Sequence, residues 1–274
     1  MALDLSKVKS RLESLKTTNS KSQHLWKPNP GKNVVRIVPY KHNPENPFIE
    51  LLFHYGINNK TYLSPASFNR PDPIVEFANK LKKTGDKEEW KEGRKLEPKM
   101  RTYVPVLVRG AEAEGVKFWG MGKQVYQEIL SIISDADYGD ITDVKTGRDI
   151  VVDFKTAEEA GKSFPETTIR VKPNQTVAFD PTDKAILEKF KDQKNILELF
   201  PELSYEELSS IMTAWLNAGD ETATPAAVTD DDATATPEEE APKTSPVAAS
   251  GKKPATSAKA VADEFDDLFS DKKK

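Results

Sequence analysis

The sequence predicts an α+β protein in which a small β-barrel core carries helical additions, a short N-terminal arm and a disordered acidic C-terminal tail. Two observations lead to this prediction. Short runs rich in β-branched and aromatic residues recur through the first 218 residues, with few helical segments between them. From Gly219 the composition changes to Ala, Thr, Pro, Asp and Glu with almost no large apolar side chains, which is typical of disorder.

The expected strands are runs of Val, Ile, Phe and Tyr bounded by turn-forming residues. They cover residues 33–40, 48–57, 101–109, 116–121, 150–155 and 167–172. Two Asn-Pro steps between Lys41 and Pro47 favour a turn between the first two strands. Five to seven short strands with few helices favour a small barrel, and an OB-type barrel is the preferred interpretation.

Helical spacing of apolar residues predicts core helices at 74–83, 123–133, 183–199 and 204–216. Ser204 followed by Glu207 is a capping-box pattern at the start of the last helix. Residues 4–16 also have an amphipathic pattern, with a basic polar side. This segment either docks on the body or forms an arm that contacts a neighbouring molecule. The predicted domains are an arm at 1–22, a core at 23–218 and a tail at 219–274.

Charge and aromatic residues are distributed unevenly between these parts. Residues 1–218 have a net charge of +2 and hold 21 of the 23 aromatic residues, whereas residues 219–274 have a net charge of −6. The tail ends in a short apolar and acidic segment around Phe265 and Phe269. A basic-aromatic body with an acidic tail and an apolar tip is typical of a single-strand nucleic-acid binder that also recruits proteins.

Several classes of protein are disfavoured by what the sequence lacks. It contains no Cys, and its three His have no metal-site spacing. It has no membrane-length apolar run and no apolar signal segment, so a soluble intracellular protein is expected. Phosphate-loop and dinucleotide-binding glycine motifs are absent, and the spacing in Gly120-Met121-Gly122-Lys123 is wrong for a phosphate loop. We therefore expect no cofactor, no membrane partner and no enzymatic activity.

Interleaved cations and aromatic rings are the positive functional signal. Arg101 and Tyr103 are two residues apart in an expected strand, so they share a face. The next strand and the helix after it add further cations and rings. This pattern predicts a β-hairpin that displays cations and aromatic rings on its surface. Cations bind phosphates, and rings stack on bases without reading the sequence; the alternative is that the rings belong to the core. The predicted nucleic-acid-binding residues are Arg94, Lys95, Lys99, Arg101, Tyr103, Arg109, Phe118, Trp119, Lys123, Lys162, Phe164, Arg170 and Lys172.

A family resemblance rests on Val35-Arg36-Ile37-Val38-Pro39, Asn46-Pro47-Phe48 and Leu52-Phe53-His54-Tyr55-Gly56. With the arm, the basic Tyr strand, the aromatic hairpin and the tail ending in Asp-Asp-Leu, the chain resembles the single-stranded DNA-binding proteins of T-even-type phages. The resemblance implies an OB-fold core that coats single strands cooperatively in replication, recombination and repair. It also implies a location in the cytoplasm of the infected host cell.

The resemblance assigns roles to individual positions. It implies that Arg36 faces the DNA, that Arg101 and Tyr103 lie in the binding strand, and that Trp119 and Phe164 stand at aromatic positions. The arm would self-associate through a short basic run followed by Ser or Thr. The corresponding arm residues are Lys9, Arg11, Lys16, Thr17 and Thr18. The tail would bind replication and recombination proteins through Phe265, Asp266, Asp267, Leu268 and Phe269.

The sequence departs from the family most clearly at its metal site. The family binds zinc through one His and three Cys. His54 stands at the His position, but residues 62–74 contain no Cys. We therefore expect a metal-free loop in which Pro residues and Phe68 replace the metal by rigidity and packing. A second departure is Lys272-Lys273-Lys274 after the acidic tip.

The function predicted from the sequence is cooperative, sequence-tolerant binding of single-stranded DNA. An RNA-binding OB module remains an alternative, because the same groups can bind either sugar. A scaffold that works only through its arm and tail is a second alternative. A nuclease is disfavoured because no carboxylate cluster in a metal-binding context occurs among the strands.

Overall fold

The structure is a computed structural model that describes residues 23–217. The arm at 1–22 and the tail at 219–274, with the self-association and partner-binding residues assigned to them, lie outside the described residues. The described chain divides into two compact units. The first comprises residues 23–51 and 100–201, and the second comprises 52–99 and 202–217. The predicted arm, core and tail boundaries stay predictions.

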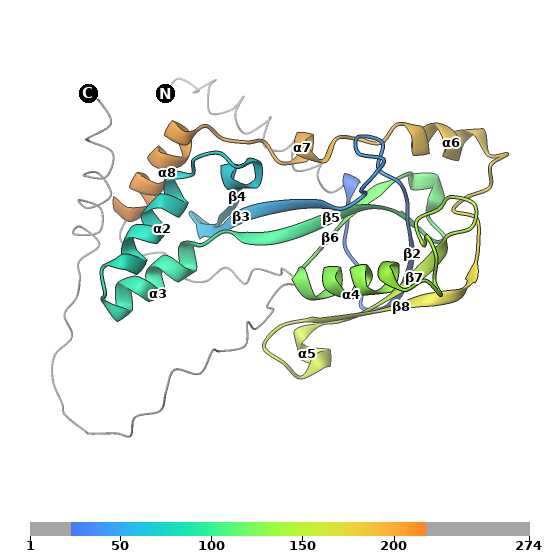
Figure 1. Ribbon diagram of the computed structural model, residues 1–274, viewed down its shortest axis with the longest axis horizontal. Helices are drawn as coiled ribbons and strands as arrows, with labels where there is room; N and C mark the ends of the chain where they lie inside the picture. Colours follow the sequence, from blue (N-terminus) through green and yellow to red (C-terminus); the bar gives the residue numbers. More distant parts are fainter. Residues whose placement is uncertain (1–22, 218–274) are drawn as a thin grey trace, which may run out of the picture. The chain divides into compact units, whose positions relative to one another are not determined.

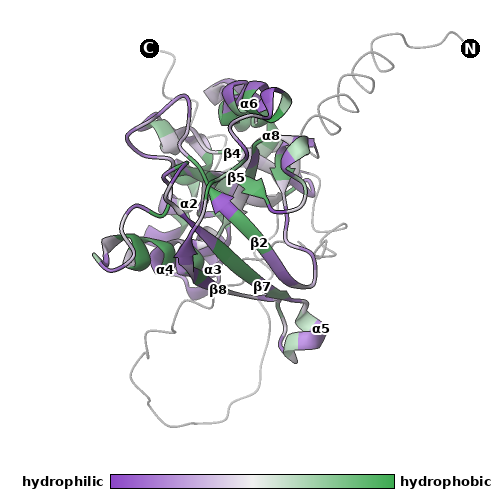
Figure 2. Cartoon of the chain, turned by 90° about the vertical axis from the view of Figure 1, so that its right-hand side faces the viewer, coloured by the Kyte–Doolittle hydropathy of each residue, from purple (hydrophilic) through white to green (hydrophobic). Residues whose placement is uncertain are grey.

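The first unit is built on a sheet with the strand order β1-β6-β5-β2-β7-β8. Its strands are β1 (Leu25–Trp26), β2 (Gly31–Ile37), β5 (Lys99–Val108), β6 (Lys117–Met121), β7 (Arg148–Lys155) and β8 (Glu166–Gln175). β1 pairs with β6 in parallel, whereas the other pairs in this order are antiparallel. Figure 2 shows β2, β7 and β8 side by side, with α5 (Ala157–Ala160) at the end of the β7–β8 hairpin.

This architecture confirms the predicted α+β class. All six expected strands occur, with ends displaced by a few residues. The sheet is OB-like, but among the described strands the order from β1 to β8 does not close into a barrel. None of the helices in residues 23–217 has the length and apolar character needed to cross a bilayer.

The main core of the first unit lies between the sheet and α4 (Lys123–Ser134). Val35 and Ile37 of β2 pack there with Ile129 of α4, and all three are fully buried. A smaller cluster on Val38, Leu107 and Phe179 packs against α6 (Lys184–Lys191). The sheet is therefore covered on one face by α4 and partly covered on the other.

The prediction of one continuous helix at 183–199 is wrong, because the chain leaves the helix between residues 191 and 196. The chain forms α6 and a separate short helix, α7 (Ile196–Leu199). The break lies at Asp192, where α6 ends, and Asn195 then caps α7 by accepting a hydrogen bond from the backbone N–H of Leu197. An N-cap side chain satisfies a helix donor that would otherwise be unpaired, so Asn195 starts a new helix here.

The second unit packs three helices around a β-hairpin. The hairpin joins β3 (Ile49–Ile57), which starts in the first unit, to β4 (Lys60–Leu63). Its two-residue turn places Asn58 and Asn59 at positive φ, as a type I′ turn requires. Figure 1 shows α2 (Pro73–Lys83) beside both α3 (Lys87–Leu96) and α8 (Tyr205–Asn217), and the three share a buried cluster with Ile57.

The helix α3 is not among the helices predicted from the sequence. Its local signals are nevertheless clear. Asp86 caps its N-terminus by accepting hydrogen bonds from the N–H groups of Glu88 and Glu89. Arg94 and Lys95 lie in its last turn, where positive charges interact favourably with the helix dipole. Gly93 allows close contact with α2, because a β-carbon there would lie 2.7 Å from the carbonyl oxygen of Ala78.

Candidate nucleic-acid interface

The sheet of the first unit sorts the predicted binding residues onto two faces. Side chains alternate along a strand, so Arg36 lies on the face opposite to Val35 and Ile37. Pairing places Tyr103 opposite Gly120, and Phe118 opposite Pro105, on this same second face. Arg170 and Lys172 also lie there, because Ile169 and Val171 belong to the core face. Trp119 belongs to the core face.

Arg36 is fully buried within a network centred on Asp149. Its Nε donates to Asp149 Oδ1 at 3.1 Å, and its Nη1 donates to the carbonyl oxygen of Thr176 at 2.9 Å. Arg109 donates twice to the same carboxylate oxygen, at 3.0 and 2.7 Å, and Lys172 lies 3.7 Å from its other oxygen. Burial lowers the pKa of Arg36, while the negative charge of Asp149 acts in the opposite direction. This pairing holds β2, β5 and β7 to the segment after β8.

The expected exposure of the aromatic hairpin is wrong. β5 and β6 do form an antiparallel hairpin, but the rings of Tyr103, Phe118 and Trp119 are all buried. Tyr103 packs 5.1 Å from Phe200, and Trp119 packs edge-on against Trp26 at 5.7 Å. The physical reason is that both faces of this part of the sheet are covered. A direct role for these rings in DNA binding stays a prediction.

Two charged positions share this buried environment. Arg36 and Arg101 are 0% and 7% exposed, so neither presents an open cationic surface in this structure. The implied position of Arg36 facing the DNA is therefore corrected to a buried ion pair with Asp149. Such buried charges are tolerated where they are paired and hydrogen-bonded.

Apart from Arg109, whose side chain is 20% exposed and bonded to Asp149, the remaining predicted cations are accessible. Side-chain exposure is 71% for Lys95, 50% for Arg94, 46% for Lys162 and 43% for Lys172. Several form surface ion pairs, such as Lys162 with Glu166 at 2.9 Å, and this bond lowers the pKa of Glu166. Exposed pairs contribute little free energy, so these cations can exchange their partners for phosphates. Lys99, Lys123 and Arg170 are also exposed, whereas Phe164 is half-buried.

An exposed tryptophan was missed by the sequence reasoning. Trp90 of α3 is 45% exposed. Four large hydrophobic residues in 23–217 are exposed, and Trp90 is the aromatic one among them. The guanidinium carbon of Arg94 lies 5.3 Å from the centre of its ring. The signal was available, because a Trp in the highly charged segment Lys87-Glu88-Glu89-Trp90-Lys91 has no obvious place in a core.

Helical geometry gathers the cations of α3 around this ring. At 100° per residue, one arc of the helix carries four cations and the indole. Gly93 and Leu96 lie on the buried side. The residues of this arc, which we name the α3 basic face, are Lys87, Trp90, Lys91, Arg94 and Lys95. Cations beside an accessible ring are the groups that bind phosphates and stack on bases.

A comparison with protein families agrees with this chemistry. A family model described as "gp32 DNA binding protein like" matches residues 29–216. The chain belongs to the gp32-like DNA-binding protein family. The match covers most of both described units, and it confirms the resemblance seen in the sequence. A search of curated proteins finds no match to this chain.

The zinc site implied by the gp32-like family does not fit the residues of this chain. Cys is absent, and residues 23–217 contain no group of three or more His, Cys, Asp or Glu side chains arranged to hold a metal ion. His54, at the family's His position, is 1% exposed and hydrogen-bonded through both ring nitrogens to protein groups. Both ring nitrogens, the atoms with which a His binds a metal ion, are therefore already bonded within the fold.

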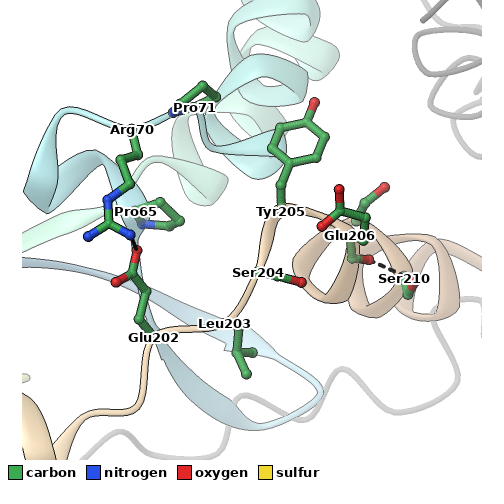
Figure 3. Close-up of a pocket in the computed structure, with 10 residues that line it drawn as sticks. Pro65, Arg70, Pro71, Glu202, Leu203, Ser204, Tyr205, Glu206 and Ser210 are labelled. Carbon is green, nitrogen blue, oxygen red and sulfur yellow. Dashed lines mark hydrogen bonds and ion pairs between the residues drawn. The ribbon is translucent and has the colours of Figure 1, made fainter. Parts of the chain in front are cut away.

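A pocket of about 850 Å³ lies in the second unit, at the start of α8. Figure 3 shows Arg70 pointing toward Glu202, with Tyr205 and Glu206 farther along the wall. The guanidinium of Arg70 is paired with Glu202 at 2.8 Å, and the wall adds a second carboxylate at Glu206. The two carboxylates of this wall outnumber its one guanidinium and repel phosphates, so the pocket lies outside the candidate nucleic-acid interface of this gp32-like protein.

Proposed function

We propose that this protein binds single-stranded DNA without catalysis, through phosphate contacts and base stacking. The observation that carries the proposal is the gp32-like family match across residues 29–216. The described residues supply the groups that such binding needs, because accessible cations occur in both units and an accessible indole occurs in the second.

In the second unit, the α3 basic face carries the proposed contact. A base stacks on the accessible part of Trp90, while the nearby cations neutralise the flanking phosphates. Arg94 pairs only loosely with Glu97, at 3.6 Å, so its guanidinium can move to a phosphate at small cost. Stacking and phosphate contacts do not read base edges, and binding is therefore tolerant of sequence.

In the first unit, the proposed contacts are the accessible cations rather than the buried rings. Lys123 opens α4, Lys162 follows α5, and Arg170 lies on β8. Arg36 and Arg109 support the contact at Arg170 indirectly, since their bonds to Asp149 fix β7, the strand with which β8 pairs.

The finer parts of the proposal concern segments outside the described residues. Residues 1–22 carry the basic amphipathic pattern of an arm that would give cooperative coating of long strands. The acidic tail, with its apolar tip around Phe265 and Leu268, would recruit replication, recombination and repair proteins. The proposed setting is the cytoplasm of an infected host cell.

Titration of the full chain with poly-dT, followed by Trp fluorescence, tests the function. Binding should weaken with salt by a slope of about −0.7 per contacted phosphate in log K against log salt concentration. A poly-rU competitor separates DNA from RNA preference, and a duplex oligomer tests strand preference. A flat salt response or tighter binding to duplex contradicts the proposal.

Deletion of residues 1–22 tests cooperativity separately. Affinity for an oligomer that holds one protein should change little, whereas the steep isotherm on long poly-dT should become shallow. An unchanged steep isotherm contradicts the role proposed for the arm.

A further inference from the structure

A buried hydrogen-bond network surrounds the carboxylate of Asp72 in the second unit. His54 Nε2 lies 2.9 Å from Asp72 Oδ2, and Ser64 Oγ donates to the same oxygen at 2.5 Å. Asp72 Oδ1 accepts from the N–H groups of Ile74 and Val75, at 2.9 and 3.2 Å, and so caps α2. His54, Ser64 and Asp72 are 1%, 0% and 3% exposed.

The geometry fixes the protons of His54. Its Nδ1 lies 3.0 Å from the backbone carbonyl oxygen of Leu96, which can only accept. Its Nε2 faces Asp72 Oδ2, which already accepts from Ser64. Three donors besides His54, namely the Ser64 hydroxyl and the N–H groups of Ile74 and Val75, favour the ionised form of this carboxylate. Next to an ionised carboxylate and a carbonyl oxygen, both ring nitrogens of His54 are placed to donate. This arrangement suits an ion pair between His54 and the buried carboxylate.

Both charges lie at favourable helix ends. Leu96 is the last residue of α3, and a cation is stabilised at a helix C-terminus. Asp72 is the N-cap of α2, where an anion is stabilised. Burial raises the pKa of Asp72, but hydrogen bonds and charge from His54 and bonds from Ser64 and Val75 outweigh it, so the pKa lies below its ordinary value.

We propose that the His54–Asp72 ion pair, completed by Ser64, takes the place of the family's zinc site and fixes the end of α3 without a metal. It joins β3, the loop after β4, the start of α2 and the end of α3. His54 is thus a positioning residue for the α3 basic face. Its effect on DNA binding rests on the proposed function, whereas its effects on protonation, metal content and α3 do not.

The first experiment is nuclear magnetic resonance of the full chain with ¹⁵N-labelled histidine at pH 7. Three His give few signals, and His54→Gln assigns the relevant one. Both ring nitrogens of His54 should be protonated. In Asp72→Asn, the new amide N–H faces Nε2, so His54 should become neutral with its proton on Nδ1. A neutral His54 in the unsubstituted protein overturns the proposal.

The second experiment compares His54→Gln with His42→Gln, because His42 is an exposed His outside this network. His54→Gln should lower Tm by roughly 5 °C or more and speed amide hydrogen exchange in α3, whereas His42→Gln should do neither. Zinc or a chelator should leave Tm unchanged in the unsubstituted protein. Unchanged exchange in His54→Gln, or one zinc per chain that His54→Gln removes, contradicts the proposal.

DNA titration of the same variants keeps the two proposals apart. If the unsubstituted protein fails to bind poly-dT, the proposed function fails while the exchange and protonation results still stand. If it binds poly-dT but amide hydrogen exchange in α3 is unchanged in His54→Gln, the proposed role of the His54–Asp72 pair fails while the proposed function stands.

Discussion

The ring of Tyr103 lies directly over the backbone of Gly120 on the neighbouring strand. A β-carbon placed on Gly120 would lie 2.8 Å from the Cε1 atom of Tyr103 and 3.3 Å from two further ring atoms. The two residues are register partners in the β5–β6 pair. Gly120 is therefore the position that allows this ring to lie flat on the sheet, with Phe200 5.1 Å from it.

Gly120→Ala should destabilise the protein because the added methyl forces the Tyr103 ring out of its place. Overpacking of this kind costs about 1–3 kcal/mol, and thermal unfolding measures it. The control is the same substitution in a Tyr103→Ala background, where the obstructing ring is absent. An equal loss of stability in both backgrounds would show that the ring contact is not the cause.

Trp90→Ala should weaken binding to poly-dT, because a stacked base is worth about 1–3 kcal/mol, or about a 5- to 150-fold change in Kd. Trp90→Phe should retain part of the affinity. Leu130→Ala is the matched control, since Leu130 is another exposed large hydrophobic residue, at 40%. Tm should change little in all three variants. Equal affinity of Trp90→Ala and Leu130→Ala would remove α3 from the interface.

Asp149→Asn should act on stability rather than on DNA contact. The substitution leaves the buried Arg36 without its anion, and breaking a buried pair costs about 3–5 kcal/mol. Lys172→Ala is the control, because that amine is 43% exposed and 3.7 Å from the carboxylate. Chemical denaturation should separate the two variants clearly. A stability loss in Asp149→Asn no larger than that in Lys172→Ala would mean that the network is not structural.

The fold was largely predictable from local patterns. Each expected strand is present in the structure. Apolar residues that alternate along a segment indicate a strand with one face covered, so this pattern can be read from the sequence alone. The capping box at Ser204 and Glu207 is also confirmed, with reciprocal hydrogen bonds of 2.8 and 3.2 Å. The break between α6 and α7 was missed because it depends on the capping side chain of Asn195 rather than on the apolar spacing.

The site was less predictable because a sequence does not show what covers a strand. Arg36 and Phe118 looked like surface groups, yet the partners that bury them, such as Asp149 and Tyr40, are distant in the chain. Trp90 was missed for the opposite reason. It belongs to a segment that reads as a charged loop until the cap at Asp86 makes it a helix.

The buried carboxylate of Asp72 should make the protein sensitive to acid. Its folded-state pKa lies below the ordinary value of 3.8, so it contributes stability at all pH values above that ordinary value. This contribution is lost as pH falls through the lower folded-state pKa, because folding then requires an ionised group that the solution protonates.

Asp72→Asn removes this linkage. The difference in Tm between the unsubstituted protein and Asp72→Asn, taken at about pH 5, should shrink as pH falls below about 4. Asp180→Asn is the control, because Asp180 also has a lowered pKa but is exposed, and its carboxylate accepts hydrogen bonds from the neighbouring Thr182. Its difference in Tm should stay small throughout, since solvent screens exposed charges. A pH-independent difference for Asp72→Asn would show that this carboxylate is not a source of acid sensitivity.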